Sequence, residues 1–274
     1  MRILVTGANG QLGREITKQG RYHDLIVTDF DTLNITDGQA VAKFFQEVKP
    51  HAVVHCAAYT NVDGAESDGD GAFRVNVIGA QNIAAGCLET GARMVYVSTD
   101  YVFNGKGTIM YREFDPVNPE TVYGRTKLQG EEIVRQILGR HYILRTAWLY
   151  GDGNNFVRTM LKLAEDHTTL KVVNDQIGTP TSTVDLAKTI FELLNMDAYG
   201  TYHATCQGQC SWYDFAQEIF KKTGKSINVS PVTTAEFPRP AKRPAYSVLD
   251  NYMLRMTIGD SMRDWREALA EYLA

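Results

Sequence analysis

The chain has 274 residues, enough for one large or two modest domains, and 44% of them are hydrophobic, so a sizeable core is expected. Lys and Arg number 28 against 32 Asp and Glu, and the resulting formal net charge of −4 excludes a nucleic-acid binder that works through bulk charge. No stretch approaches the roughly 18 consecutive apolar residues that a membrane span requires.

The first half of the chain alternates short apolar runs with amphipathic stretches. The apolar runs are rich in β-branched residues, which is typical of strands buried on both faces of a parallel sheet; they are Arg2–Thr6, Leu25–Thr28, Ala52–Cys56, Arg93–Ser98 and Tyr142–Thr146. The amphipathic stretches predict helices over Gln11–Gln19, Gln39–Val48, Ala72–Thr90 and Val122–Leu138. This alternation predicts an α/β fold with a doubly wound parallel sheet.

The pattern loosens after Gly151. Helices are predicted there over Asn155–Glu165, Thr183–Leu194, from Ser211 onward and near Asp260–Leu273. Ser211 and Asp214 stand at the spacing of a capping box, and a Pro-rich segment over 238–244 interrupts regular structure before the last helix. We therefore expect residues 1–150 to form the sheet domain. Residues 151–274 would form a small, mostly helical lobe, with some crossover segments returning to the sheet.

The N-terminal end and the cysteines suggest a compartment. Residues 1–7 run directly into a strand pattern, without the features of a signal peptide. The four cysteines are too few and too scattered for a disulfide scaffold, and they lack the paired spacing of a zinc site; they are Cys56, Cys87, Cys206 and Cys210. We expect reduced packing residues in a cytoplasmic protein.

A glycine-rich turn follows the first predicted strand and opens the first predicted helix. Its sequence over 6–13 is TGANGQLG, with glycines at Gly7, Gly10 and Gly13. This spacing permits a tight turn, close approach of a ligand to the backbone, and close packing of helix on strand, while the helix N-terminus attracts a pyrophosphate. A purely structural turn is the alternative. The position after a strand favours dinucleotide binding.

Two residues near this turn bear on the choice of cofactor. Asp29 ends the second predicted strand, where a carboxylate can accept hydrogen bonds from an adenosine ribose and favour NAD. Arg14 lies beside the turn and could bind the 2′-phosphate of NADP. A solvated loop acid is the alternative for Asp29. The sequence therefore leaves NADPH and NADH open.

Tyr123 and Lys127 stand four residues apart, on one face of a predicted helix. A free tyrosine has a pKa of about 10, and a lysine ammonium one turn away would lower it towards the range useful for acid–base catalysis. The fourth predicted strand ends in Ser98 and Thr99, whose hydroxyls could bind a carbonyl oxygen. Together with the phosphate turn, these residues indicate a proton-transfer site beside a nucleotide cofactor.

At this point the chain resembles the extended short-chain dehydrogenases/reductases and, within them, the dTDP-4-dehydrorhamnose reductase family over nearly its full length. The resemblance implies a Rossmann-type sheet domain that binds the dinucleotide and a C-terminal lobe that binds the substrate. It rests on several separated motifs in the right order, namely the phosphate turn, residues 55–66 (HCAAYTNVDGAE), 76–79 (NVIG), 98–103 (STDYVF), 145–151 (RTAWLYG), 174–181 (NDQIGTPT), Arg243-Pro244 and 247–249 (SVL).

The resemblance also implies residues for the cofactor. The pyrophosphate would lie on Gly10, Gln11 and Leu12, within the turn from Gly7 to Gly13, and Asp29 would hold the adenosine end. The cofactor channel near the ribose would be lined by Ala58, Tyr59 and Thr60. Lys127 would bind the nicotinamide ribose as well as tune Tyr123. Asn34-Ile35 departs from the family pattern, in which an Asp before the second helix contacts the adenine.

For the substrate, the resemblance implies that Thr99 positions a sugar ketone and that Asp100 touches the sugar. Tyr123 would donate the proton. Trp148 would pack against the substrate, although its apolar neighbours also allow a core role. Arg243 would bind the substrate diphosphate, because a guanidinium can bond two oxygens at once, and a surface charge is the alternative.

The implied activity is NAD(P)H-dependent reduction of the C4 ketone of dTDP-4-dehydro-L-rhamnose to dTDP-L-rhamnose, a nucleotide-sugar precursor. Another nucleotide-sugar epimerase, dehydratase or reductase on the same scaffold is the alternative, followed by a regulatory subunit without catalysis. We expect a dTDP-linked 4-keto-6-deoxy sugar as partner, no nucleic acid or membrane, and a monomer or homodimer. Some relatives bridge a dimer through magnesium and glutamates; Val184 and Arg266 stand at matching places, with Glu15 present, so no metal ligands are assigned.

Overall fold

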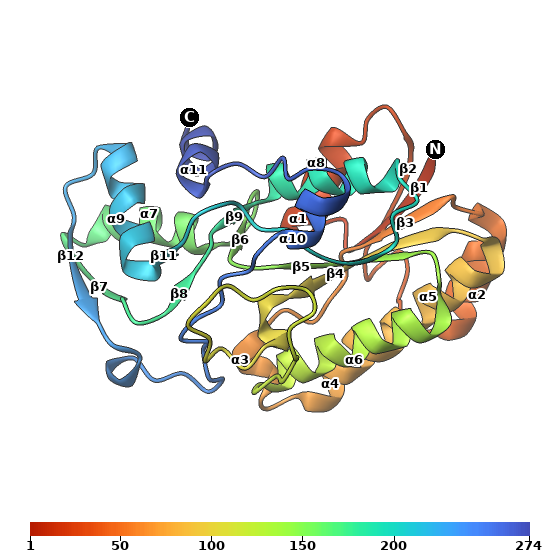
Figure 1. Cartoon of the computed structure of the whole chain (residues 1–274), viewed down its shortest axis with the longest axis horizontal. Coiled ribbons are helices and arrows are strands. Elements are labelled where there is room, and N and C mark those ends of the chain that lie inside the picture. The colour runs from red at the N-terminus through yellow and green to blue at the C-terminus, as the bar shows by residue number, and fades with distance from the viewer.

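A computed structural model describes residues 1–274. A six-stranded sheet forms its centre, and all strands in it are parallel. Their spatial order is β10 (Gly200–His203), β5 (His141–Thr146), β4 (Arg93–Thr99), β3 (Ala52–His55), β1 (Arg2–Thr6) and β2 (Asp24–Thr28). The order reverses beside β1, so the chain winds outward in both directions from that strand (Figure 1). This confirms the predicted doubly wound fold.

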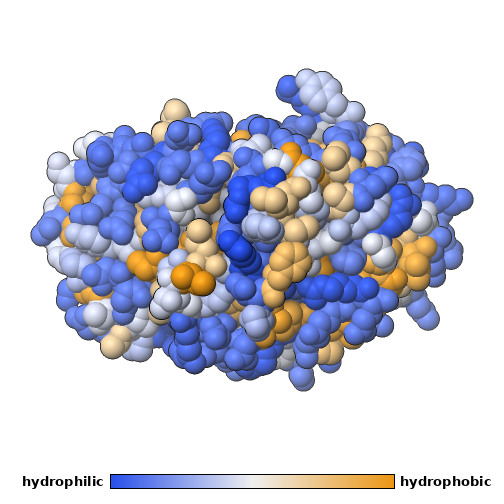
Figure 2. Space-filling view, in the orientation of Figure 1, coloured by the Kyte–Doolittle hydropathy of each residue, from blue (hydrophilic) through white to orange (hydrophobic).

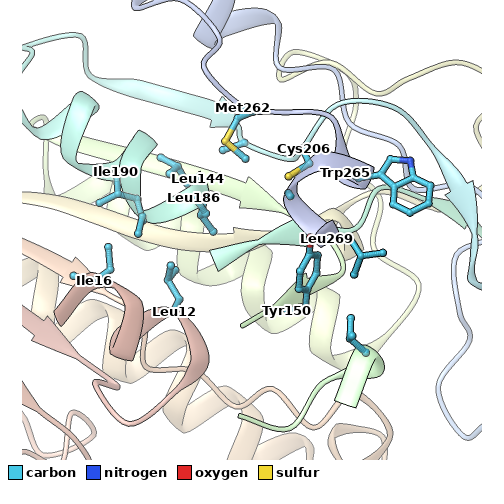
Figure 3. Close-up of a cluster of buried hydrophobic side chains, with 14 of the residues drawn as sticks. Leu12, Ile16, Leu144, Tyr150, Leu186, Ile190, Cys206, Met262, Trp265 and Leu269 are labelled. Carbon is cyan, nitrogen blue, oxygen red and sulfur yellow. The ribbon is translucent and has the colours of Figure 1, made fainter. Parts of the chain in front are cut away.

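Helices cover both faces of the sheet because successive side chains of each strand point to opposite sides. On β1, Ile3 and Val5 belong to one core with α1 (Gln11–Gln19) and α8 (Thr183–Leu194). Figure 3 shows the side chains that these two helices contribute to it, Leu12 and Ile16 from α1 and Leu186 and Ile190 from α8. Leu4, between Ile3 and Val5, packs into a second core with α2 (Gly38–Val48), α5 (Ala80–Thr90) and α6 (Val122–Ile137). The two cores explain why the strands are apolar without alternation.

The C-terminal lobe lies at one end of the molecule, on the left in Figure 1. It contains α7 (Phe156–Asp166), α9 (Trp212–Thr223) and α11 (Trp265–Leu273), with β7 (Thr169–Val173) parallel to β12 (Asn228–Val232). Two further strand pairs are β8 (Ile177–Gly178) with β11 (Cys210–Ser211) and β6 (Leu149–Tyr150) with β9 (Thr181–Ser182). The predicted capping box at the start of α9 is present, with Ser211 and Asp214 in reciprocal hydrogen bonds.

The strand β10 was not predicted. Its sequence, GTYH, lacks a continuous apolar run, so only pairing with β5 reveals it as a strand. It belongs to the main sheet although it comes from the second half of the chain, as does α8, which packs on α1. The division of the chain into domains at residue 150 stays a prediction.

Two predicted helices differ in the structure. The helix over Ala72–Thr90 is three segments: α4 (Gly69–Phe73), a π-helical turn η1 (Arg74–Gly79) and α5. The last helix begins at Trp265 and not at Asp260, because the Asp264 side chain accepts a hydrogen bond from the Arg266 N–H and caps it. A short helix, α10 (Tyr252–Thr257), was not predicted.

The surface in view is mainly hydrophilic, with apolar side chains in small separate groups (Figure 2). The most exposed large apolar residues come from different segments of the chain and include Tyr22, Phe30, Ile109 and Phe114. None of the helices combines the length and the apolar character needed to cross a bilayer.

Candidate active site

A cavity of about 990 Å³ lies at the carboxyl ends of the central strands, where parallel sheets bind ligands. Its volume is at the upper end of the roughly 300–1,000 Å³ typical of ligand pockets. The predicted site residues that line it are Gly7, Gly10, Gln11, Leu12, Gly13, Ala58, Thr60, Thr99, Asp100, Tyr123, Lys127, Trp148 and Arg243. Asp29 and Tyr59 are not among the lining residues. The fold therefore brings segments far apart in sequence into one cavity.

The phosphate turn has the geometry that its glycines predict. Gly7 has φ +67°, and a Cβ there would lie 2.7 Å from the backbone N of Ala57. A Cβ on Gly13 would lie 2.3 Å from the carbonyl oxygen of Gly7. No side chain caps the N-terminus of α1 at Gly10, and no acidic residue stands in its first turn. The free N–H groups and the helix dipole thus fit a pyrophosphate.

Asp29 lies beside this turn, at the end of β2. Its carboxylate accepts hydrogen bonds from the N–H groups of Asn9 and Phe30, both at 2.8 Å. Arg14 donates to the carbonyl oxygen of Asn9 and lies 3.3 Å from the Asp152 carboxylate. Both side chains are therefore held near the turn, and their parts in binding an adenosine ribose or its phosphate stay predictions.

The segment after β3 is held by a buried asparagine of the π-helical turn. Asn76 is 1% exposed; its Oδ1 accepts the N–H of Tyr59 at 2.8 Å, and its Nδ2 donates to Thr126 Oγ1 at 3.0 Å. Thr126 lies on α6, next to Lys127. The wider π turn thus connects the predicted cofactor channel to the helix that carries Tyr123, and π turns of this kind are frequent at functional sites.

Tyr123 and Lys127 come from the first turns of α6, which Thr121 caps by accepting the Gly124 N–H at 3.0 Å. The ring of Tyr101 packs edge-on against Tyr123, with centroids 5.5 Å apart. Lys127 Nζ donates to the carbonyl oxygen of Val97 at 2.7 Å and lies 4.1 Å from the centre of the Tyr96 ring. One of three ammonium donors is thereby used, which leaves two for a ligand.

Burial dominates the protonation of this pair. It raises the pKa of Tyr123 to about 12, although the Thr99 side chain opposes the shift. It lowers the pKa of Lys127 to about 7, against the opposing charge of Glu131. We expected Lys127 to lower the pKa of Tyr123, but burial has the larger effect. Removing both groups from water favours their neutral forms, so the pKa of the tyrosine rises and that of the lysine falls.

Thr99 and Asp100 follow β4 directly. The Thr99 hydroxyl donates to Asp100 Oδ1 at 3.0 Å and accepts the N–H of Tyr101 at 3.2 Å. Asp100 is 4% exposed, burial raises its pKa to about 6, and its Oδ2 has no hydrogen-bond partner. A buried acceptor without a partner is costly, so this oxygen is suited to a hydroxyl donor on a ligand in the cavity.

A buried ion pair between Arg145 and Glu131, not predicted from the sequence, lies next to the site. Arg145, on β5, donates to both oxygens of Glu131, on α6, at 2.9 and 2.8 Å, and Ser98 donates to Glu131 at 2.5 Å. Burial works to raise the pKa of Glu131, but the hydrogen bonds and charge of Arg145 outweigh it and hold the pKa below its ordinary value. An arginine within an apolar strand, and an acid one turn after Lys127, are the signals that could have revealed it.

We expect Glu131→Gln to lower the free energy of unfolding by about 3–5 kcal/mol, because it leaves the buried guanidinium of Arg145 without its counterion. Urea denaturation at pH 7 measures this. Arg135→Gln is the matched control: Arg135 contacts the same carboxylate at 2.6 Å, but its side chain is 35% exposed, so a loss below about 1 kcal/mol is expected. Equal losses in both variants would contradict the prediction.

Trp148 projects from the loop after β5 in a left-handed backbone conformation, with φ +47°. Its ring stacks on Trp212 of the C-terminal lobe, with centroids 3.5 Å apart and planes 7° apart. A Cβ on Gly178 would lie 2.5 Å from the Trp148 ring, so only glycine fits beneath it. Both tryptophans line the cavity. Strained backbone of this kind clusters at functional sites. Trp212 was not predicted to line the cavity, because the sequence shows it only as the first residue of a helix.

Arg243 lies in the segment 237–244 that leads from the lobe back to the sheet domain. Its guanidinium contacts the carboxylate of Asp63 at 2.8 Å, and both side chains are mostly buried. Asp63, Arg239 and Phe237 also line the cavity, and the sequence alone assigned them no role there. Across residues 1–274, His, Cys, Asp and Glu side chains form no group of three or more that could hold a metal ion.

With this geometry in place, the chain can be compared with known proteins. A family model described as the RmlD substrate binding domain matches residues 1–274. The chain belongs to this family. The match spans both the sheet and the lobe, so the Rossmann-type fold and the C-terminal half are shared with the family as a whole.

Individual proteins are similar over nearly their full length. The spore coat polysaccharide biosynthesis protein SpsK of Bacillus subtilis (strain 168) is 46% identical, over 99% of this chain and 96% of that protein. A crystal structure of a dTDP-4-dehydrorhamnose reductase from Clostridium acetobutylicum is 56% identical, with a TM-score of 0.98 over 100% of this chain and 98% of that one. A crystal structure of the Bacillus anthracis dTDP-4-dehydrorhamnose reductase in complex with NADP is 42% identical, with a TM-score of 0.97 over 99% of this chain and 98% of that one.

Proposed function

We propose that this protein reduces the C4 ketone of dTDP-4-dehydro-L-rhamnose with NADPH or NADH and releases dTDP-L-rhamnose. The observation that carries the proposal is the convergence of Thr99, Tyr123 and Lys127 with the phosphate turn in one cavity. Similar proteins named dTDP-4-dehydrorhamnose reductase, one of them bound to NADP, support the substrate and the cofactor.

The cofactor would lie along the phosphate turn, on Gly10, Gln11 and Leu12, where the free N–H groups of α1 face the cavity edge. Gln11 Oε1 accepts the N–H of Gly151 at 2.9 Å, so this side chain is already fixed. The two free donors of Lys127 would bind the nicotinamide ribose. When bound, a nicotinamide dinucleotide supplies the hydride for the carbonyl carbon.

Side chains of the protein would bind and protonate the ketone oxygen. Tyr123 donates its phenolic proton to the ketone oxygen as negative charge develops there. The high pKa of Tyr123 keeps it protonated and therefore competent as the donor at neutral pH. Thr99 would bind the same oxygen, for which its hydroxyl must leave Asp100 Oδ1. Asp100 would then accept a sugar hydroxyl with its unpartnered oxygen.

The rest of the substrate would extend towards the lobe. Trp148, stacked on Trp212, offers a flat apolar surface, and Arg243 offers donors for the diphosphate. Binding these remote groups would orient the ketone against the cofactor. We also propose a cytoplasmic location, which suits the four free thiols, and a monomer or homodimer.

The test is NADPH and NADH oxidation, followed by absorbance, with the dTDP-4-keto-6-deoxy sugar generated in place by its 3,5-epimerase. We expect rapid oxidation only when the epimerase is present, because the reductase requires the epimerised ketone. Oxidation that does not depend on the epimerase would contradict the stereochemistry. Stoichiometric NAD retained through purification would instead favour an epimerase or dehydratase, in which the cofactor is recycled in place.

A further inference from the structure

A segment of the lobe crosses to the sheet domain beside the cavity. This strap, residues 237–244, follows β12 and contains Arg243. In Figure 1 it descends from the lobe and runs towards α3 (Val62–Ala65). The strap contains no helix or strand, so no regular backbone hydrogen bonding of its own fixes where Arg243 lies. Contacts with the sheet domain must do so.

Asp63 makes two of these contacts. Its Oδ1 accepts the N–H of Ala241 at 3.1 Å, and its Oδ2 lies 2.8 Å from a terminal nitrogen of Arg243. The other terminal nitrogen of Arg243 donates to the carbonyl oxygen of Ala241 at 3.3 Å. Asp63, Ala241 and Arg243 thus form a closed set of hydrogen bonds that fixes both the strap backbone and the plane of the guanidinium.

The element that carries Asp63 is itself fixed to the helix of Tyr123. Asn61 caps α3 by accepting the Gly64 N–H at 2.9 Å. Glu66, directly after α3, accepts the N–H of Val122, the first residue of α6, at 2.9 Å. A short rigid path therefore leads from the start of the helix that holds Tyr123, through α3, to Arg243.

We propose that Asp63 is a positioning residue that presents Arg243 to the diphosphate of the substrate. This inference rests on the proposed function. A guanidinium has five N–H donors, and Arg243 uses two of them within the protein, so three are left for phosphate oxygens. Since these donors have fixed directions, their value for a diphosphate depends on the orientation of the group.

The alternative effect of Asp63 has the opposite sign. A carboxylate beside Arg243 partly neutralises it and competes with phosphate, so its removal would strengthen diphosphate binding. The second bond, to the N–H of Ala241, decides between the two effects. A carboxylate that only competed with phosphate would contact the guanidinium alone. Asp63 also accepts the N–H of Ala241, and this bond holds the strap backbone in place.

The test uses the full-length protein saturated with NADPH and measures dTDP and thymidine binding by calorimetry. We expect Asp63→Ala to weaken dTDP binding about tenfold, equivalent to about 1.4 kcal/mol. Thymidine, which has no phosphate, should bind as to the wild type. With the sugar substrate, KM should rise with little change in kcat. Asp63→Asn, which keeps an acceptor but removes the charge, should lie between wild type and Asp63→Ala.

Two further variants separate the explanations. Glu120→Ala is the matched control, because Glu120 contacts the neighbouring strap residue Lys242, whose side chain is 63% exposed, and neither residue lines the cavity; its dTDP affinity should stay at the wild-type value. Arg243→Gln should weaken dTDP binding as much as Asp63→Ala, and the double variant should lose no more than either.

Tighter dTDP binding by Asp63→Asn would overturn the inference in favour of competition. Equal losses for dTDP and thymidine, or a loss in Glu120→Ala as large as in Asp63→Ala, would overturn it in favour of general strap disorder. These outcomes concern only the role of Asp63 and do not bear on whether the wild type reduces the sugar. Failure of the wild type to reduce the sugar while it still binds dTDP would instead refute the proposed function.

Discussion

Tyr123→Phe is expected to lower kcat about a thousandfold while the affinity for NADPH stays at the wild-type value. The change removes one hydroxyl, and with it the proton that the ketone oxygen needs; positioned proton donors typically contribute 10²–10⁴-fold. The ring still packs edge-on against Tyr101, so the fold around it should be preserved. Stopped-flow oxidation of NADPH and fluorescence titration of the cofactor measure the two quantities.

Tyr22→Phe serves as the control for tyrosine replacement, because Tyr22 is 81% exposed and does not line the cavity. Its kcat should equal that of the wild type. Turnover of Tyr123→Phe close to the wild-type rate would show that another group delivers the proton. Loss of cofactor binding together with turnover would show instead that the variant damages the site as a whole.

Lys127→Met is expected to lower kcat about a hundredfold and to weaken cofactor binding about tenfold. Methionine fills a similar volume, but it removes the ammonium that donates to Val97 and the two donors proposed for the ribose. A hydrogen bond from a charged group contributes about 1.5–3 kcal/mol, which accounts for a tenfold change in affinity. An unchanged cofactor titration would refute the ribose contact.

The lysine also predicts how the reaction depends on pH. Because burial lowers the pKa of Lys127 to about 7, its charged form predominates below that pH and is lost as the pH rises. The ratio kcat/KM should therefore fall above about pH 7 if the ammonium is required. Arginine stays charged throughout this range, so residual activity in Lys127→Arg should show no such decline. A decline of the same midpoint in both proteins would assign it to another group.

Most of the proposed cofactor-binding part of the site could be predicted from the sequence, because it depends on residues that are close together in the chain. The phosphate turn, the strands beside it and the pair Tyr123 and Lys127 are short-range features, set by glycine freedom, apolar runs and the period of a helix. The strand ends follow from them, since parallel strands finish at one edge of the sheet. The five predicted strands and the fold class were confirmed for this reason.

The sequence by itself thus determined the fold class, the phosphate turn and the helical face that carries Tyr123. Only the tertiary structure decided the partners that meet across the cavity: Arg145 with Glu131, Trp212 against Trp148, and Asp63 with Arg243. It also decided that β10 completes the sheet and that burial, more than the lysine, sets the pKa of Tyr123. The physical reason is common to all of them: pairing, stacking and loss of water depend on residues distant in the chain, which local periodicity does not record.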